Sequence, residues 1–118
     1  MNALPEGCDG VLVVEGSIDT DTHFKRYCVV NTGQINVVIG RADSDININH
    51  PVISRKHARL ESDGEFMTLS DLGSSSGTFI KGVPCLQGEV MFIETEDVIF
   101  LADVRIRFNV IKKQGELS

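Results

Sequence analysis

A two-residue alternation of apolar and polar side chains, repeated in short segments along the chain, constrains the fold more than any other feature. It is clearest in residues 104–110, where four apolar side chains alternate with two arginines and one asparagine. Successive side chains of a strand point to opposite faces, so this segment predicts a strand with one buried face. No window of 11 or more residues has apolar side chains at a helical period, and the chain has no internal repeat. We therefore expect an all-β protein.

The apolar segments are short and closely spaced, which is typical of a two-sheet sandwich. Strands are expected at residues 11–14, 26–30, 36–39, 46–48, 57–61, 65–70, 78–80, 90–93, 98–101 and 104–110. Residues 16–23 are predicted to form a loop. Asp63-Gly64 predicts a type I′ hairpin turn, because both central positions of that turn need a positive φ. Lys81-Gly82 predicts a further turn.

The chain has the size and composition of one domain, since 118 residues of which 42% are hydrophobic can fill one core. We expect the domain to span residues 11–111, between a flexible leader at 1–10 and a flexible tail at 112–118. No apolar run approaches the roughly 18 residues that a membrane span needs. Residues 1–7 lack the basic and apolar regions of a signal peptide. The expectation is a cytoplasmic monomer that does not bind membranes.

The cysteines and histidines form no pattern of a disulfide framework or a metal site. Cys8, Cys28 and Cys85 are odd in number, far apart and outside any CxxC spacing, so free thiols are expected. None of the three histidines lies at a helical or hairpin spacing that would join it to these cysteines. We expect no metal and no cofactor.

The net charge of −6 argues against nucleic acid as a partner, because that affinity comes largely from a basic face that neutralises phosphates. The charge is also unevenly distributed. Residues 40–60 contain four cations and two anions, whereas residues 82–103 contain five anions and no cation. An acidic body with a small basic spot suits a discrete anionic group better than a polyanion.

Three polar loops within residues 40–82 carry the candidate site, since β scaffolds commonly place binding residues in such loops. Arg41 offers a planar fork that can hold a phosphate through two hydrogen bonds, and Ser54 offers a hydroxyl. Arg55 or Lys56 can add charge. Residues 73–77 can point backbone N–H groups and serine hydroxyls at the same spot. Phosphothreonine, with a charge of about −1.5 to −2 and three acceptor oxygens, matches these donors.

The order and spacing of these loops resemble the forkhead-associated (FHA) domain family. The family pattern is Gly-Arg, then Ser-x-x-His, then Asp-Leu-x-Ser-x-Asn-Gly-Thr and a further Gly. In this chain it reads GR at residues 40–41, SRKH at 54–57 and DLGSSSGT at 71–78, with Gly82 beyond. The resemblance covers residues 11–110, which is nearly the whole chain.

The resemblance implies an eleven-stranded, antiparallel-rich β-sandwich whose loops at one end bind phosphothreonine peptides. The residues that it implies for phosphopeptide binding are Arg41, Ser54, Arg55, Ser75 and Ser76. Of these, Arg41, Ser54 and Arg55 would contact the phosphate, and Ser75 would donate a hydroxyl or an amide. The residues that it implies for support of the loops are Gly40, His57 and Gly77, with His57 bracing them by hydrogen bonds rather than touching the ligand.

The chain departs from the family pattern in two regions. Ser76 stands where the family usually has an Asn that holds the peptide backbone, and its shorter reach and single donor imply a weaker or shifted grip on the peptide. Glu96 and Ala102 stand where glycines are common, away from the loops, so they are expected to affect turn geometry only.

The leading interpretation is a non-catalytic phosphothreonine-recognition module that acts as a signalling adaptor. Its partner would be a substrate of a Ser/Thr kinase or the kinase itself. The alternative is an interaction or self-association module that works without phosphate, which Ser76 and the acidic surface favour. An enzyme is disfavoured, because Ser54 and His57 have no third orienting group and the glycine loop lacks the Gly-Lys-Ser/Thr ending of a P-loop.

Overall fold

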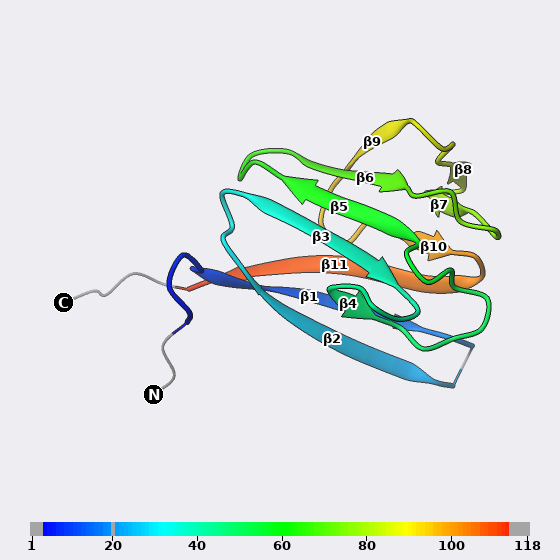
Figure 1. Ribbon diagram of the computed structural model, residues 1–118, viewed down its shortest axis with the longest axis horizontal. Helices are drawn as coiled ribbons and strands as arrows, with labels where there is room; N and C mark the ends of the chain where they lie inside the picture. Colours follow the sequence, from blue (N-terminus) through cyan, green and yellow to red (C-terminus); the bar gives the residue numbers. More distant parts are fainter. Residues whose placement is uncertain (1–3, 20, 114–118) are drawn as a thin grey trace.

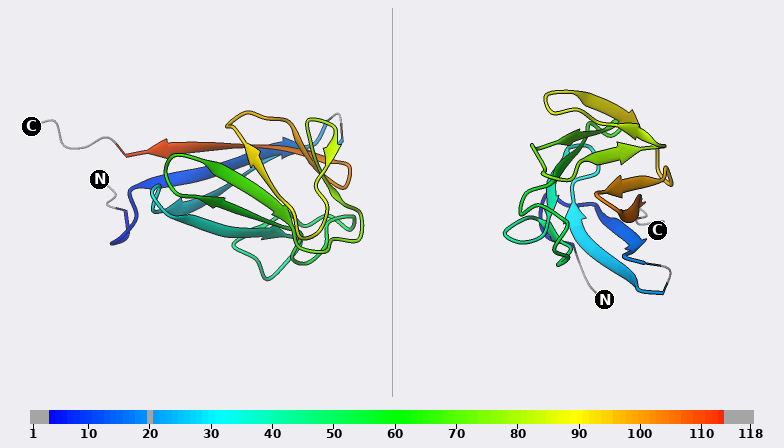
Figure 2. Two further views of the ribbon diagram at one scale, coloured as in Figure 1. Left: turned by 90° about the horizontal axis from the view of Figure 1, so that it is seen from above. Right: turned by 90° about the vertical axis from the view of Figure 1, so that its right-hand side faces the viewer.

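The computed structural model describes residues 4–19 and 21–113, which form eleven strands in two facing sheets (Figure 1). Within these residues there is no helix, and hence none that is long and apolar enough to cross a membrane. The all-β sandwich expected from the alternation is confirmed. Figure 2 shows the two layers from above and from the right-hand end.

The first sheet has six strands in the order β2-β1-β11-β10-β7-β8. Its members are β1 (Gly10–Ser17), β2 (His23–Val30), β7 (Thr78–Ile80), β8 (Val83–Pro84), β10 (Ile99–Leu101) and β11 (Val104–Lys112). The second sheet has five strands in the order β4-β3-β5-β6-β9. Its members are β3 (Ile35–Gly40), β4 (Ile46–Asn47), β5 (Ala58–Ser62), β6 (Met67–Asp71) and β9 (Val90–Ile93). The pair of β3 with β4 is parallel, and the other pairs are antiparallel.

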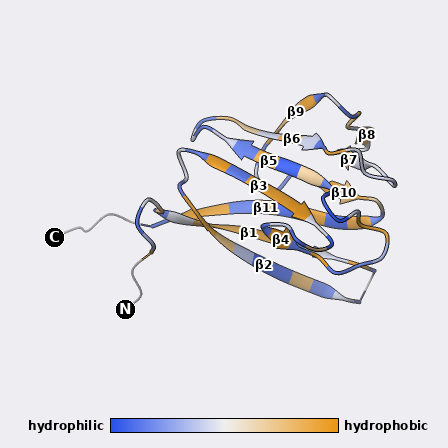
Figure 3. Cartoon of the chain, viewed as in Figure 1, coloured by the Kyte–Doolittle hydropathy of each residue, from blue (hydrophilic) through white to orange (hydrophobic). Residues whose placement is uncertain are grey.

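The hydrophobic core lies between the sheets and is made by the inward half of each alternating strand (Figure 3). On β11, Ile106 and Phe108 are buried while Arg105 and Arg107 between and beside them are exposed. The predicted inward positions on β5 are buried in the same way. Burial of apolar surface from both sheets is the main force that holds such a sandwich together. The alternation therefore reports the core correctly.

The turn between β5 and β6 differs from the prediction. Of the predicted pair only Gly64 has a positive φ, of 94°, and β6 begins at Met67. The carboxylate of Asp63 instead accepts hydrogen bonds from the N–H groups of Glu65 and Phe66, at 2.9 and 2.8 Å. This capping makes a four-residue loop in which Asp63 needs no left-handed backbone. The type I′ prediction for Asp63-Gly64 was therefore wrong.

A two-residue turn with positive φ at both positions occurs instead between β7 and β8. Lys81 has a φ of 51° and Gly82 a φ of 82°, and the flanking residues Ile80 and Val83 are paired. These are the features of a type I′ hairpin. The pattern missed β8 because it is only two residues long and contains Pro84, which is confined to strand edges.

The predicted loop at residues 16–23 is also shorter in the structure. β1 continues to Ser17 and β2 begins at His23, so three residues of the polar segment belong to strands. Gly16 pairs with Ile106 on one side and Phe24 on the other. Backbone pairing with a neighbour on each side holds this segment in the sheet despite its polar composition. Main-chain hydrogen bonds do not depend on side-chain polarity, so alternation alone did not find them.

The predicted leader and tail lie only partly within the described residues, since 1–3 and 114–118 are outside them. β1 begins at Gly10, the last residue of the predicted leader, and β11 ends at Lys112. Asp9 joins the preceding segment to β2, because its N–H donates to the carbonyl of Val30 at 3.0 Å and its carboxylate accepts from Thr32.

The loops that carry the candidate residues all lie at one end of the sandwich (Figure 1). They connect β3 to β4, β4 to β5, and β6 to β7, and the start of β1 and the end of β11 lie at the opposite end. Strand pairing produces this arrangement, since Ile39 near the end of β3 pairs with Ala58 at the start of β5, and Ala58 pairs in turn with Asp71 at the end of β6.

Candidate functional site

His57 connects the second and third loops through hydrogen bonds at both ring nitrogens. It is fully buried, its Nδ1 accepts from the backbone N–H of Ser54 at 3.1 Å, and its Nε2 lies 2.8 Å from the carbonyl oxygen of Gly77. Because Nδ1 accepts, the proton of a neutral ring must be on Nε2, which donates to Gly77. Burial lowers the pKa of His57, and the hydrogen bond to Gly77 opposes that shift only in part. The ring is thus held neutral in one tautomer.

The carboxylate of Asp71 shapes the glycine-rich loop between β6 and β7. It accepts hydrogen bonds from the hydroxyls of Ser74 and Thr78, each at 2.6 Å, and from the N–H groups of Gly73 and Ser74, each at 2.9 Å. Burial alone would raise the pKa of Asp71, but these four donors together lower it below its ordinary value. A buried charge with four donors is well satisfied, so the loop has one strongly preferred shape.

Gly77 completes this loop and links it to the other sheet. Its φ of 93° favours glycine, and its N–H donates to the hydroxyl of Ser74 at 2.9 Å. Its carbonyl oxygen accepts from His57 and also from the N–H of Ala102 at 2.9 Å. The carbonyl of Gly77 is therefore fixed from two directions.

Gly40 and Arg41 bring the first loop against the second. A Cβ on Gly40 would lie 1.9 Å from the carbonyl oxygen of Arg55, so no side chain fits at this crossing. The backbone N–H of Arg41 donates to the carbonyl of Ser54 at 2.9 Å, and its guanidinium donates through Nη1 to the carbonyl of Ile53 at 2.9 Å. One of its five donors is used in this way, and Arg41 as a whole is half-buried.

Ser54 and Ser75 lie directly together although 21 residues separate them in the sequence. The N–H of Ser75 donates to the hydroxyl oxygen of Ser54 at 3.1 Å, and the two hydroxyl oxygens are 3.3 Å apart. The second and third loops therefore present their hydroxyl and amide groups at one place, beside the loop that carries Arg41.

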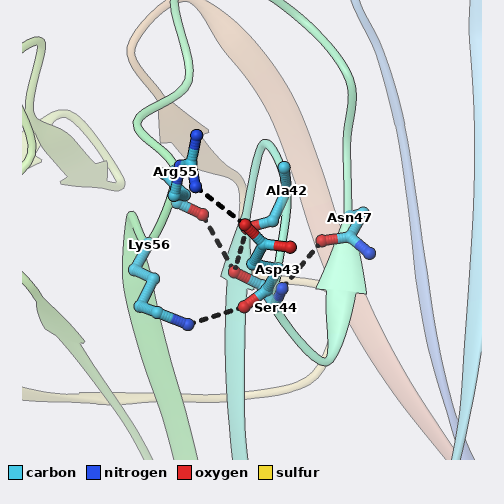
Figure 4. A network of polar contacts seen from close by, with 6 residues as sticks. All are labelled: Ala42, Asp43, Ser44, Asn47, Arg55 and Lys56. Carbon is cyan, nitrogen blue, oxygen red and sulfur yellow. Dashed lines mark hydrogen bonds and ion pairs between the residues drawn. The ribbon is translucent and has the colours of Figure 1, made fainter.

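Arg55 is brought to the first loop by a contact that the sequence did not indicate. Nη1 of Arg55 forms an ion pair with the carboxylate of Asp43, at 2.8 Å, and Nζ of Lys56 donates a hydrogen bond to the carbonyl oxygen of Asp43 (Figure 4). Both side chains of the ion pair are exposed, by 63% for Arg55 and 69% for Asp43. Asp43 has a φ of 55°, in the region that Asp tolerates better than most residues. Arg55, one of the cations predicted to bind phosphate, is thus already paired with the carboxylate of Asp43.

Ser44 holds the remainder of the first loop in place (Figure 4). Its hydroxyl lies 2.9 Å from the carbonyl of Arg55 and 3.1 Å from that of Ala42, and its N–H donates to the side chain of Asn47 at 3.0 Å. Ser76, in contrast, is exposed. The structure therefore brings Ser54 and Ser75 together beside Arg41, whereas the Arg55 side chain is paired with Asp43 of the first loop and Ser76 is exposed on the third loop.

The predicted site residues did not include several residues that shape these loops. Asp71 and Thr78 were part of the recognised motif, yet their mutual hydrogen bond was not foreseen. The signal was present, because a buried motif Asp followed by two hydroxyl residues predicts an Asx-type loop. The ion pair of Asp43 with Arg55 could not be predicted from the sequence, since one acidic residue in a polar loop is ordinarily solvated.

The residues at 4–19 and 21–113 contain no group of three or more His, Cys, Asp or Glu side chains that could hold a metal ion. Cys8, Cys28 and Cys85 are free, and Cys85 is buried. Burial raises the pKa of the Cys28 and Cys85 thiols, which makes both poorer nucleophiles at neutral pH.

Comparison with known proteins agrees with this loop geometry. A model of the FHA domain matches residues 37–102, which hold all three loops. The chain belongs to the FHA domain family. FHA domains are interaction modules that generally have no enzymatic activity.

The FHA match extends to individual relatives. The FHA domain-containing protein FhaB of Mycobacterium tuberculosis is 36% identical over 69 residues, which cover 49% of this chain and 44% of FhaB. The chain thus spans less than half the length of this curated relative.

Two solved structures show the same fold at low identity. An FHA structure described under "phosphothreonine-dependent FHA domain interactions" is 25% identical, with a TM-score of 0.62 over 92% of this chain and 99% of that chain. The FHA domain of FhaA, complexed with the intracellular domain of a second protein, is 26% identical, with a TM-score of 0.61 over 82% and 99%. The expected family and sandwich fold are confirmed.

Proposed function

We propose that this FHA domain binds phosphothreonine-containing segments of a partner protein at the surface formed by Arg41, Ser54, Arg55 and Ser75. The observation that carries the proposal is the meeting of Ser54 and Ser75 across two loops, beside the oriented fork of Arg41. A phosphate placed there meets the hydroxyl groups of Ser54 and Ser75 together with the guanidinium of Arg41. Charge-assisted hydrogen bonds of this kind contribute about 1.5–3 kcal/mol each.

The described relatives support the same chemistry. One of the similar FHA structures is described by its phosphothreonine-dependent interactions. The partner of this chain would accordingly be a substrate of a Ser/Thr kinase or the kinase itself. Ser76 lies on the exposed rim of the third loop, so in this proposal it contacts the peptide beside the phosphothreonine.

A catalytic role for Ser54 and His57 conflicts with their contacts. The hydroxyl of Ser54 faces Ser75, while His57 accepts from the backbone N–H of Ser54 rather than from its hydroxyl. The other ring nitrogen is held by Gly77. A nucleophile needs a base within hydrogen-bond reach of its own proton, and His57 is committed elsewhere. We therefore propose binding without catalysis.

The test is a titration of the protein with a degenerate phosphothreonine peptide library, beside phosphoserine and unphosphorylated versions. We expect the phosphothreonine peptides to bind most tightly. Arg41→Ala should weaken binding at least tenfold, because the loss of a charge-assisted contact exceeds the 1.4 kcal/mol that corresponds to one decade. Arg41→Lys should recover part of the affinity, since it keeps the charge but loses the planar fork.

The matched control is Lys112→Ala, which removes one positive charge at the opposite end of the sandwich. It should change the affinity less than twofold. A phosphopeptide that binds Arg41→Ala as tightly as the wild type, with the variant shown to be folded, would refute the assignment.

A further inference from the structure

A cluster of exposed apolar side chains lies on β9 and at the last loop residue before β6. It consists of Phe66, Val90 and Phe92, which are 57%, 59% and 72% exposed. The rings of Phe66 and Phe92 meet edge to face, with their centroids 5.9 Å apart. We call these three residues the β9 surface. Gathered apolar side chains of this size on a folded domain mark an interaction site more often than scattered ones do.

The β9 surface is not a part of the core that has been left open. The alternate residues of the same strand, Met91 and Ile93, pack inward, while Phe92 and Val90 face outward opposite Thr68 and Ser70 of β6. The strand therefore has an apolar residue at every position, inward and outward. A strand with a solvated outer face ordinarily has polar residues there. Figure 3 shows β9 as an apolar band at the margin of its sheet.

β9 is also the edge strand of the five-stranded sheet. It pairs with β6 on one side, and no strand of the described chain pairs with its other side. An antiparallel edge strand presents alternate N–H and C=O groups outward, which can accept an added strand. Segments that bind in this way gain affinity from main-chain hydrogen bonds and specificity from side chains on the sheet face.

Acidic groups surround this surface. A groove of about 790 Å³ lies next to the two rings, and its lining includes the charged residues Glu65, Lys81, Glu94 and Asp97. Lys81 lies 3.5 Å from Asp97, so its charge is already matched. Glu65 and Glu94 have no cation within ion-pair distance in the described part of the chain, and Glu89 precedes β9 with none either. The groove and both ends of β9 thus carry unmatched negative charge.

These charges decide between a second copy of the chain and another kind of partner. Antiparallel pairing of two copies along β9 would bring Glu89 of one copy close to Glu94 of the other at each end of the paired strands. Like charges brought together in this way repel each other. Each chain also carries a net charge of −6, which adds to the repulsion. The surface suits a partner of opposite charge.

We propose that the β9 edge and the Phe66–Phe92 groove bind an extended segment of another protein with apolar residues flanked by lysines or arginines. The segment adds a strand to β9, places apolar side chains against Val90 and Phe92, and presents its cations to Glu65, Glu89 and Glu94. Arginine or lysine over the exposed rings gains a further cation–π contact. This interaction needs no phosphate and is independent of the phosphothreonine site.

The test uses a fluorescein-labelled peptide with the sequence KRVSISVRK as the probe, and EEVSISVEE as the charge-reversed comparison, in anisotropy titrations with the full chain. The basic probe should bind and the acidic one should not. Added salt should weaken the binding of the basic probe, because part of the attraction is between exposed charges. Arg41→Ala should leave this binding unchanged, which separates the result from the fate of the phosphothreonine proposal.

Two variants locate the binding. Phe92→Ser should lower the affinity for the basic probe at least fivefold. Glu94→Lys, which retains the apolar strand, should lower it about threefold. The matched control is Tyr27→Ser on β2, since Tyr27 is 64% exposed on the other sheet and should have no effect. No binding of the basic probe, or equal losses with Tyr27→Ser and Phe92→Ser, would overturn the proposal. A dimer of the wild type that Phe92→Ser dissociates would instead identify a second copy as the occupant and equally overturn it.

Discussion

Two regions at the same end of the molecule are built in opposite ways. The first comprises His57, Asp71 and Thr78, which are the buried polar residues of the described chain, at 0%, 8% and 1% exposure. The second is the contact of Arg55 and Lys56 with Asp43, whose ion pair is exposed to solvent on both sides. Both consist of polar contacts between loops. They differ in what happens when a contact is lost.

Loss of a contact in the buried region leaves a polar atom without a partner and without water, which costs about 1–3 kcal/mol for each atom. No buried side-chain nitrogen or oxygen of the described residues lacks a partner, so that region starts fully satisfied. Loss of an exposed ion pair costs little, since water replaces the partner. The buried region therefore holds the loops in shape, and the exposed contact can exchange its partner for a phosphate.

The largest effect is expected from His57→Ala. The variant leaves the N–H of Ser54 and the carbonyl of Gly77 without the ring, so the free energy of unfolding should fall by about 3 kcal/mol. Urea unfolding measures the loss. His23→Ala, on the exposed start of β2, is the control and should change stability by less than about 0.5 kcal/mol. Equal effects of the two substitutions would mean that the ring does not support the loops.

The protonation of His57 gives the next effect. Because burial lowers its pKa in the folded protein, the folded state binds fewer protons than the unfolded state below an ordinary pKa of about 6.5. Its contribution to stability is thus complete above that pH and is lost as the pH falls toward the lowered value. The free energy of unfolding should change with pH by up to about 1.4 kcal/mol per pH unit as a result of His57.

Unfolding measured from pH 7.5 to 5 checks this dependence against His57→Gln, which does not titrate there. The difference in the free energy of unfolding between the wild type and His57→Gln should shrink as the pH falls. Asp71 should contribute only at lower pH still, because its pKa is lowered below the ordinary Asp range. A difference that does not change with pH would contradict the neutral ring.

The exposed contact should respond to Asp43→Asn with a gain in binding rather than a loss of stability. Without the carboxylate, Arg55 has no internal anion to release before it meets a phosphate. The affinity for a phosphothreonine peptide should rise about two- to fivefold, the range of an exposed ion pair. Titration calorimetry measures it, with Asp103→Asn on the exposed turn before β11 as the control. A lower affinity would show instead that Asp43 positions Arg55 for the ligand.

The smallest effect is expected in the turn that faces Gly77. Ala102 has a φ of 58°, where an L side chain is strained and glycine is not. Ala102→Gly should therefore stabilise the protein by about 0.5 kcal/mol, because the relieved strain exceeds the added freedom of the unfolded chain. Ala42→Gly, at a residue without a positive φ, should destabilise it by a similar amount. Thermal unfolding of the two variants gives the comparison.

Sequence reasoning predicted most of the fold because strands with one buried face show it in their alternation. Residues 104–110 and the inward positions of β5 are examples. It failed where backbone pairing does not depend on side-chain polarity, as at Gly16, and where a carboxylate replaced special backbone geometry, as at Asp63. The expected influence of Glu96 and Ala102 on turn geometry agrees with their φ of 74° and 58°.

At the candidate site, the motif predicted which residues lie in the three loops but not which hydrogen bonds and ion pairs they form. The hydrogen bonds of Asp71 depend on the bend of the third loop, and the pairing of Arg55 with Asp43 depends on how two loops cross at Gly40. Contacts between loops have no period and no fixed spacing. They follow from the three-dimensional arrangement alone.

A phosphate site at the three loops is tested most directly by a map of amide chemical shifts as a phosphothreonine peptide is added to ¹⁵N-labelled protein. We expect the largest changes at Arg41, Ser54 and Ser75, a smaller change at Asp43 as Arg55 exchanges partners, and none at Phe92. The unphosphorylated peptide should move none of these signals. Changes centred on β9 or β2, or equal changes with both peptides, would contradict a phosphate site at the three loops.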